Sequence, residues 1–88
     1  MKIKEIQYTP TFEKAFNKLP KEIQNQAVIR ENIFRSDAFD PKLKTHKLKG
    51  KFKNYYSFSI SRSYRVVFRF LSNGKILFLD CGDHSVYK

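Results

Sequence analysis

The 88-residue sequence predicts an α+β fold in which a helical hairpin packs on one face of a mostly antiparallel, four-stranded sheet. One short strand-like segment comes first, a helix-spaced stretch split by Pro20 follows, and three strand-like segments fill the C-terminal half. The predicted order is therefore β-α-α-β-β-β. The length suits a single domain over residues 1–88.

Residues 3–8 predict a short strand at or near a sheet edge, because their apolar and polar residues alternate imperfectly. Thr9 and Thr11 flank Pro10, and either threonine can cap the start of a helix. The apolar face of that helix has the spacing i, i+3, i+4, i+7 and comprises Phe12, Ala15, Phe16 and Leu19. Pro20 ends this helix and can occupy the first turn of the next.

The second helix is predicted from about residue 20 to residue 34 or 35. Its apolar stripe comprises Ile23, Ala27, Arg30 and Phe34, widened by Ile29 and Ile33. These stripes indicate core rather than a ligand pocket. Residues 36–41 form a loop, from which Phe39 is expected to contact the core.

Three strands are predicted in the second half of the chain. Residues 54–60 alternate, so that Tyr56, Phe58 and Ile60 face the core and Tyr55, Ser57 and Ser59 face away. The chain turns at residues 61–63 and returns antiparallel to residue 70. Asn73 and Gly74 suit the positive φ of a hairpin turn. Residues 75–81 are mostly apolar, which favours a central strand.

The strand that ends at Phe70 carries two different faces. Tyr64, Val66, Phe68 and Phe70 suit the core, whereas Arg65, Val67 and Arg69 fall on the face opposite the helices. The two arginines lie about 14 Å apart along such a strand. Guanidinium groups fixed on an open sheet face suit phosphate binding. The alternative is that they are solvated and that their stems cover apolar surface.

A net charge of +10 implies a polyanionic partner, whether nucleic acid, a membrane surface or an acidic protein. Residues 42–53 hold six lysines and His46, interleaved with apolar residues. A solvated face is the alternative. Candidate nucleic-acid contacts are Lys44, Lys47, Lys49, Lys51, Lys53, Arg62 and Arg69. Tyr55 can stack on a base or pack across strands.

Several classes of protein and site are disfavoured. No apolar run approaches the roughly 18 residues of a membrane span, and the N-terminus lacks a signal peptide's apolar stretch. The single Cys81 predicts a buried, inert thiol and fits a reducing cytoplasm. One cysteine and two separated histidines do not make a zinc motif, so no metal or other cofactor is expected.

Three motifs occur in a characteristic order: His46-Lys47-Leu48-Lys49-Gly50, then Tyr64-Arg65-Val66-Val67-Phe68, then Gly82-Asp83-His84 with Val86-Tyr87. Over essentially the whole chain, this order resembles the RelE/ParE superfamily of bacterial toxins, and most closely its RelE and YafQ branches. The resemblance implies a RelE-like fold and a toxin paired with an antitoxin. RelE-type members are ribosome-dependent mRNA endonucleases, whereas ParE-type members inhibit DNA gyrase and lack the nuclease residues.

The resemblance also implies roles for individual residues. Arg65 matches the arginine that contacts the scissile phosphate, and His46 and His84 match histidines of the YafQ branch. Tyr87 matches a C-terminal aromatic that stacks on a base or aids catalysis, although its spacing from His84 is slightly short. The sequence also departs from RelE in carrying Ser57 and Ser59 where RelE has lysines.

These residue types suit RNA cleavage without metal, in which the 2′-OH attacks the adjacent phosphorus. The reaction needs a base, an acid and a cation for the charged phosphorane. Histidine suits both proton roles and arginine the third. We expect His84 to be the general acid or base, His46 its partner or a phosphate donor, and Arg65 the clamp. The alternatives are that His46 is one more surface cation and His84 an idle side chain.

Three functions remain open: a ribosome-dependent mRNA interferase, a ParE-like gyrase inhibitor, and a non-catalytic RNA-binding module. The combination of His46, Arg65 and His84 favours the first. That function implies a cytoplasmic enzyme that inhibits translation, with the ribosome, mRNA and an antitoxin as partners and no small-molecule cofactor.

Overall fold

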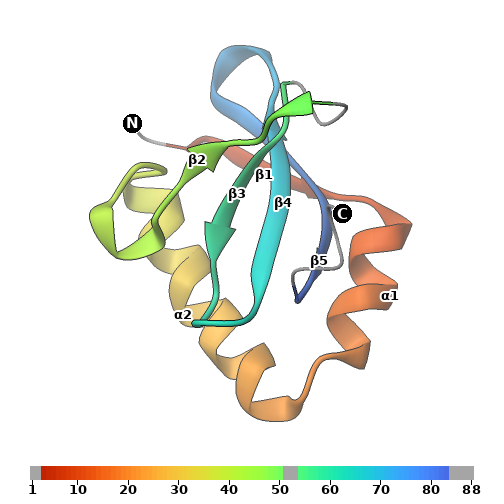
Figure 1. The fold of residues 1–88 in the computed structure, drawn as a ribbon. Coiled ribbons are helices and arrows are strands. Elements are labelled where there is room, and N and C mark those ends of the chain that lie inside the picture. Colours follow the sequence, from red (N-terminus) through yellow and green to blue (C-terminus); the bar gives the residue numbers. More distant parts are fainter. Residues whose placement is uncertain (1–2, 51–53, 84–88) are drawn as a thin grey trace.

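The computed structural model describes residues 3–50 and 54–83 (Figure 1). The helices and strands are β1 (Glu5–Tyr8), α1 (Pro10–Lys18), α2 (Lys21–Ser36), η1 (Pro41–Leu43), β2 (His46–Lys47), β3 (Tyr56–Ser59), β4 (Arg65–Phe70), η3 (Ser72–Gly74) and β5 (Lys75–Gly82). The α+β fold class with an N-terminal helical hairpin is confirmed. Across the described ranges, no helix has the length and apolar character needed to cross a membrane.

The sheet has the strand order β1-β5-β4-β3-β2. β1 lies at one edge, as expected, and pairs parallel with β5, while the other neighbours pair antiparallel. β5 lies between β1 and β4, which explains its apolar composition. The structure adds a fifth strand to the four predicted, because the two residues of β2 pair with β3 at the opposite edge.

The helical hairpin begins at a threonine cap. The Thr9 hydroxyl accepts a hydrogen bond from the Phe12 backbone N–H at 3.0 Å, so the first of the two candidate threonines is the cap. The side chain of Gln24 donates to the carbonyls of Phe16 and Leu19, both at 3.1 Å. These bonds satisfy carbonyl groups at the end of α1 and tie the two helices together.

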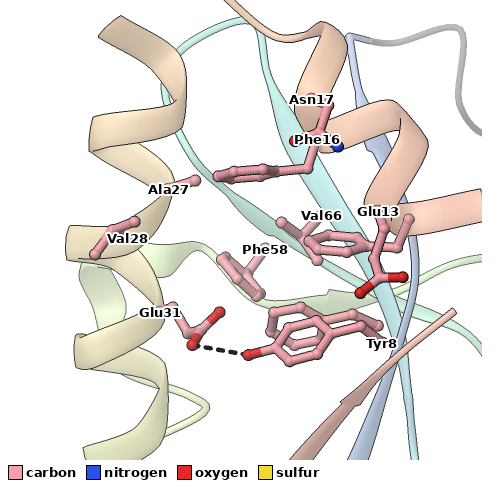
Figure 2. A pocket seen from close by; sticks show the side chains of 11 residues that line it. Tyr8, Glu13, Phe16, Asn17, Ala27, Val28, Glu31, Phe58 and Val66 are labelled. Atoms are coloured by element: carbon pink, nitrogen blue, oxygen red, sulfur yellow. Dashed lines mark hydrogen bonds between the residues drawn. The ribbon is translucent and has the colours of Figure 1, made fainter. Parts of the chain in front are cut away.

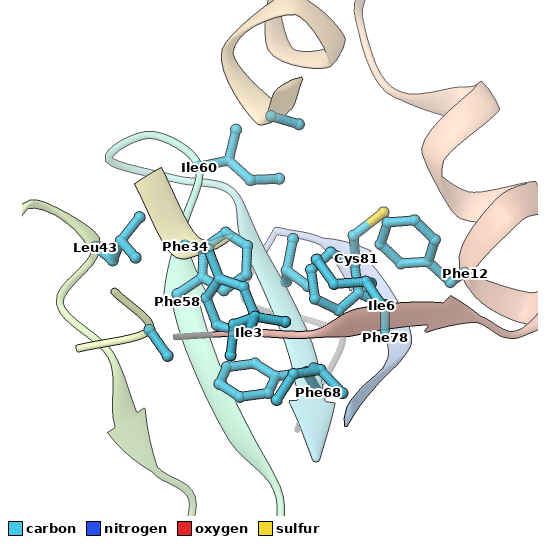
Figure 3. Close-up of a cluster of buried hydrophobic side chains, with 14 of the residues drawn as sticks. Ile3, Ile6, Phe12, Phe34, Leu43, Phe58, Ile60, Phe68, Phe78 and Cys81 are labelled. Atoms are coloured by element: carbon cyan, nitrogen blue, oxygen red, sulfur yellow. The ribbon is translucent and has the colours of Figure 1, made fainter. Parts of the chain in front are cut away.

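Aromatic side chains fill the core between the helices and the sheet (Figure 3). Phe34 of α2 stacks on Phe58 of β3 and meets Phe68 of β4 edge-on, with ring centroids 4.9 Å apart in both pairs. Phe78 of β5 completes the group, 5.6 Å from Phe34. Each such pair contributes about 0.5–1.5 kcal/mol beyond the burial of its area.

One predicted core residue, Ile29, is wrong, and Phe39 is more exposed than a core residue. Ile29 is 53% exposed, because it lies two positions, or about 200° around the helix, from the buried Ala27. Phe39 is 47% exposed and stacks on Phe70 with ring centroids 5.9 Å apart. Because Phe70 is itself packed against the core cluster, Phe39 contacts the outer edge of the core, as expected, but remains half exposed.

The face opposite the helices is less open than expected. Ser57 is 0% exposed, Val67 3% and Leu48 8%, although none of them belongs to the main core. The Leu48 backbone N–H donates to the Tyr55 carbonyl at 2.9 Å, which continues the pairing of β2 and β3. Leu48, which directly follows the edge strand β2, therefore lies beside the face opposite the helices.

Candidate functional site

The strand pairing places the predicted site residues on one face of the sheet. Side chains of paired residues point to the same face. His46 of β2 pairs with Ser57, which pairs with Val67, which pairs with Asp80. The neighbouring row, two residues along, is made by Ser59, Arg65 and Gly82. His46 and Arg65 therefore project from the same face, opposite the helices.

No hydrogen bond joins His46 to Arg65. They lie two strands apart and two residues along, which corresponds to about 12 Å between their Cα atoms. An imidazole and a guanidinium separated in this way can reach one phosphodiester from its two sides.

Arg65 is held by the neighbouring strand. Its Nη1 donates a hydrogen bond to the Oγ of Ser59. Its Nε is buried and has no hydrogen-bond partner among residues 3–50 and 54–83. Buried donors are nearly always paired, so an unpaired N–H on a charged group marks a position where an acceptor is missing.

His46 is exposed on the edge strand, and its Nδ1 lies 3.0 Å from the backbone carbonyl oxygen of Lys44. A carbonyl can only accept, so in the neutral ring Nδ1 carries the hydrogen and Nε2 keeps its lone pair. Lys44 adopts left-handed backbone angles, φ 53° and ψ 39°, at the end of η1. This arrangement suits Nε2 to accept a proton.

The predicted nucleic-acid contacts do not all lie on the same face of the sheet. Lys44, Lys49, Arg62 and Arg69 are exposed, and Arg69 projects from the same face as Arg65. Lys47 pairs with Tyr56, which packs against the core, so Lys47 lies on the helix side instead. Tyr55 is partly buried. The four remaining site predictions lie outside the described residues: Lys51, Lys53, His84 and Tyr87.

Two groups on the face of the sheet that carries Arg65 (the Arg65 face) were not predicted as site residues. Alternation along the strand predicts that Ser59 faces away from the core, but nothing in the local pattern pairs its hydroxyl with Arg65. Asp80 projects from the same face, and its Oδ1 accepts from the Cys81 backbone N–H at 2.8 Å. Asp80 could have been recognised from the sequence, because it is a lone carboxylate in a mostly apolar strand. Within residues 3–50 and 54–83, no cluster of three or more His, Cys, Asp or Glu could hold a metal ion.

A separate cleft of about 560 Å³ lies on the helix side, between α1, α2 and the sheet (Figure 2). Aromatic and aliphatic side chains form most of its walls, and Glu13 and Glu31 provide its carboxylates. The Tyr8 hydroxyl donates to Glu31 Oε2 at 3.0 Å. Burial, together with the Glu31 carboxylate, raises the pKa of Tyr8. Because Phe58 and Val66 line this cleft from the core face, it is distinct from the Arg65 face.

Comparison with solved structures identifies proteins of similar fold. No family model matches the sequence, and no curated protein matches it. Among solved structures, the fold is similar to YafQ from E. coli strain BL21(DE3), with a TM-score of 0.72 and 17% identity over 93% of this chain and 94% of that one. It is similar to a YoeB/ParE toxin from Agrobacterium tumefaciens, with a TM-score of 0.77 and 18% identity over 92% and 99% of the two chains.

A third similar structure is the archaeal RelE–RelB complex from Pyrococcus horikoshii OT3, with a TM-score of 0.74 and 20% identity over 94% and 96% of the two chains. The resemblance predicted from three short motifs is thus confirmed in the fold, over nearly the full length of each of these similar chains. The chain has the RelE-like fold shared by the YafQ, YoeB/ParE and RelE proteins to which it is similar.

Proposed function

We propose that this protein is the toxin of a toxin–antitoxin pair and that it cleaves mRNA on the ribosome. The observation that carries the proposal is the common face of His46 and Arg65, on which no described residue provides an acceptor for the Arg65 Nε. The fold is similar to that of structures described as toxins, which supports the toxin role.

In the proposed reaction, the 2′-oxygen attacks the adjacent phosphorus and the bond from phosphorus to the 5′-oxygen breaks. His46 Nε2 takes the proton of the 2′-OH, since its Nδ1 faces the Lys44 carbonyl. His84, two residues beyond the partner of Arg65 on β5, supplies a proton to the leaving 5′-oxygen. Arg65 stabilises the charge on the phosphorane. The products are a 2′,3′-cyclic phosphate and a 5′-hydroxyl.

Positioning of the RNA uses the remaining cations. Arg69 and Arg62 are exposed near the Arg65 strand, and Lys44 and Lys49 are exposed near β2. Such contacts to phosphates fix the register of the strand without reading its sequence. We propose that Tyr87 stacks on a base beside the cleaved linkage, and that the ribosome presents the mRNA in the cytoplasm.

We propose that an antitoxin binds the helical hairpin and the basic face. Similar structures include the toxin–antitoxin complex RelBE2 from Mycobacterium tuberculosis and the DinJ–YafQ complex from E. coli. In this chain, Val28 and Ile29 of α2 are 56% and 53% exposed, and Val28 also lines the apolar cleft. Exposed apolar groups beside a cleft are typical of protein-binding surfaces.

Primer extension on cellular transcripts after induction tests the proposal. Wild type should produce new 5′ ends. Arg65→Ala should reduce cleavage about 10²–10³-fold, as the loss of transition-state charge stabilisation does. His84→Gln should reduce it about 10²–10⁴-fold, as the loss of a general acid does.

Lys14→Ala is the matched control, because it also removes one positive charge but lies exposed on α1, across the sheet from Arg65. It should cleave like wild type. If mRNA stays intact and a DNA-damage response appears, the protein is a gyrase inhibitor and the proposed nuclease function is wrong. If mRNA stays intact and the cells are not harmed, the protein is an RNA-binding module.

A further inference from the structure

We infer that Ser59 is a positioning residue that holds the Arg65 guanidinium so that one edge of it is presented to a phosphate. This inference rests on the proposed function and assigns a task to a residue that is neither acid, base nor cation.

The first observation is the hydrogen bond between the two side chains. Ser59 and Arg65 are paired across β3 and β4, and the Arg65 Nη1 donates to the Ser59 Oγ. Ser59 is only 7% exposed, so its hydroxyl is shielded from competing water. A hydroxyl fixed on a paired strand defines where one nitrogen of the guanidinium lies.

The second observation is the nitrogen that Ser59 leaves without a partner. A guanidinium is a planar fork whose side edge is formed by Nε and the far terminal nitrogen, Nη2. Nη1 is occupied by Ser59, while Nε is buried and is not paired with any residue that the structure describes. The Nε–H of the side edge therefore has no acceptor in the described part of the chain, although solvent does not reach it. A phosphate that placed one oxygen on Nε and another on Nη2 would remove the cost of the unpaired donor.

Ser57 offers a comparison on the same strand. It lies two residues before Ser59, on the same face, and is 0% exposed. Its Oγ has no hydrogen-bond partner within the described ranges, so it does not hold Arg65. Ser57→Ala and Ser59→Ala therefore make the same chemical change at two buried positions, but only the second removes the Arg65 contact.

The test is NMR of the uniformly ¹⁵N-labelled, full-length protein, with inorganic phosphate as the probe at constant ionic strength. The Arg65 Nε–H resonance is identified as the arginine signal that disappears from the spectrum of the Arg65→Lys variant. In wild type, this resonance should shift as phosphate is added. Ser59→Ala should weaken phosphate binding about tenfold, the effect of one lost hydrogen bond to a charged group. Ser57→Ala should bind phosphate like wild type.

Ser59→Thr keeps the hydroxyl and should restore phosphate binding, which separates positioning from packing. The amide spectrum of each variant reports whether it is folded. Equal phosphate affinity in wild type and in folded Ser59→Ala would overturn the inference, as would equal weakening in Ser57→Ala.

Cleavage assays separate this inference from the proposed function. If Arg65→Ala loses cleavage while Ser59→Ala keeps it, the positioning role fails and the nuclease stands. If wild type and Arg65→Ala leave transcripts equally intact, the proposed function itself fails. Loss of cleavage in Ser59→Ala and its return in Ser59→Thr would support both.

Discussion

Cys81 shows how strongly position governs the chemistry of one side chain. It is 3% exposed and belongs to the core cluster. Burial, with a smaller effect of the Asp80 carboxylate, raises its thiol pKa from 9.0 to about 12. A thiol that remains protonated is a poor nucleophile, so the expectation of an inert cysteine is supported by its surroundings.

This pKa predicts a pH-dependent loss of stability. Below pH 9 the thiol is neutral in both states. Between about pH 9 and 12 only the unfolded state releases the proton, so the free energy of unfolding should fall as pH rises. Urea denaturation at several pH values from 7.5 to 10.5 measures the slope. Cys81→Ala should have a shallower slope over this range, and an unchanged slope would contradict the assignment.

Thr9 joins two elements through one hydroxyl. Its Oγ1 accepts from the Phe12 backbone N–H at the start of α1 and donates to the Leu79 carbonyl on β5 at 2.9 Å. Leu79 is the residue left over where the pairing of β4 and β5 shifts, since Val67 pairs with Asp80 and Phe68 with Phe78. The cap of the helix thus also satisfies the irregular part of the strand.

Thr9→Ala should lower the free energy of unfolding by about 1–2 kcal/mol, because it removes both the cap and the partner of the Leu79 carbonyl. Thr9→Ser keeps the hydroxyl and should lose much less. Thr11→Ala is a control in the same helical turn at an exposed position, and should change stability by less than about 0.5 kcal/mol. Urea denaturation measures all three. Equal losses in Thr9→Ala and Thr11→Ala would show that the cap has no special role.

The charge of the molecule as a whole bears on RNA binding in general rather than on cleavage. The chain has eighteen lysine and arginine residues and eight aspartate and glutamate residues, which gives a net charge of +10. Binding that depends on phosphate contacts releases counterions and therefore weakens with salt.

A fluorescently labelled single-stranded RNA should bind with an affinity that falls linearly on a log–log plot against salt. Arg69→Ala, on the Arg65 face, should reduce the magnitude of the slope by about 0.7 if it removes one phosphate contact. Lys14→Ala on α1 should leave the slope unchanged. Fluorescence anisotropy at 50–300 mM salt measures this, and equal slopes for both variants would mean that RNA has no preferred face.

The predictions that succeeded rest on local patterns. The apolar spacing of Phe12 and Leu19 predicted the face of α1, and both side chains are buried. Asn73 and Gly74 were predicted to adopt positive φ, and their φ angles are 60° and 76°. These features depend on a few neighbouring residues, so they can be recognised before the fold is known.

The missed features depend on pairing between distant segments. The two-residue strand β2 is too short for any periodicity, and it exists because residues 46–47 meet β3. Simple alternation along β5 would place Asp80 on the same side as Phe78 and leave Cys81 opposite. The extra residue at Leu79 reverses this, so that Cys81 enters the core and Asp80 joins the Arg65 face.

The order of elements, the apolar faces of α1 and β4 and the excess of positive charge follow directly from the amino-acid sequence, because periodicity, turn chemistry and charge are local or additive properties. Alternation predicts that Ser59 and Arg65 face away from the core, but the addition of His46 and Asp80 to the same face required the folded chain. Strand register and the irregularity at Leu79 settle that grouping, and a shift of one residue would send each side chain to the other face.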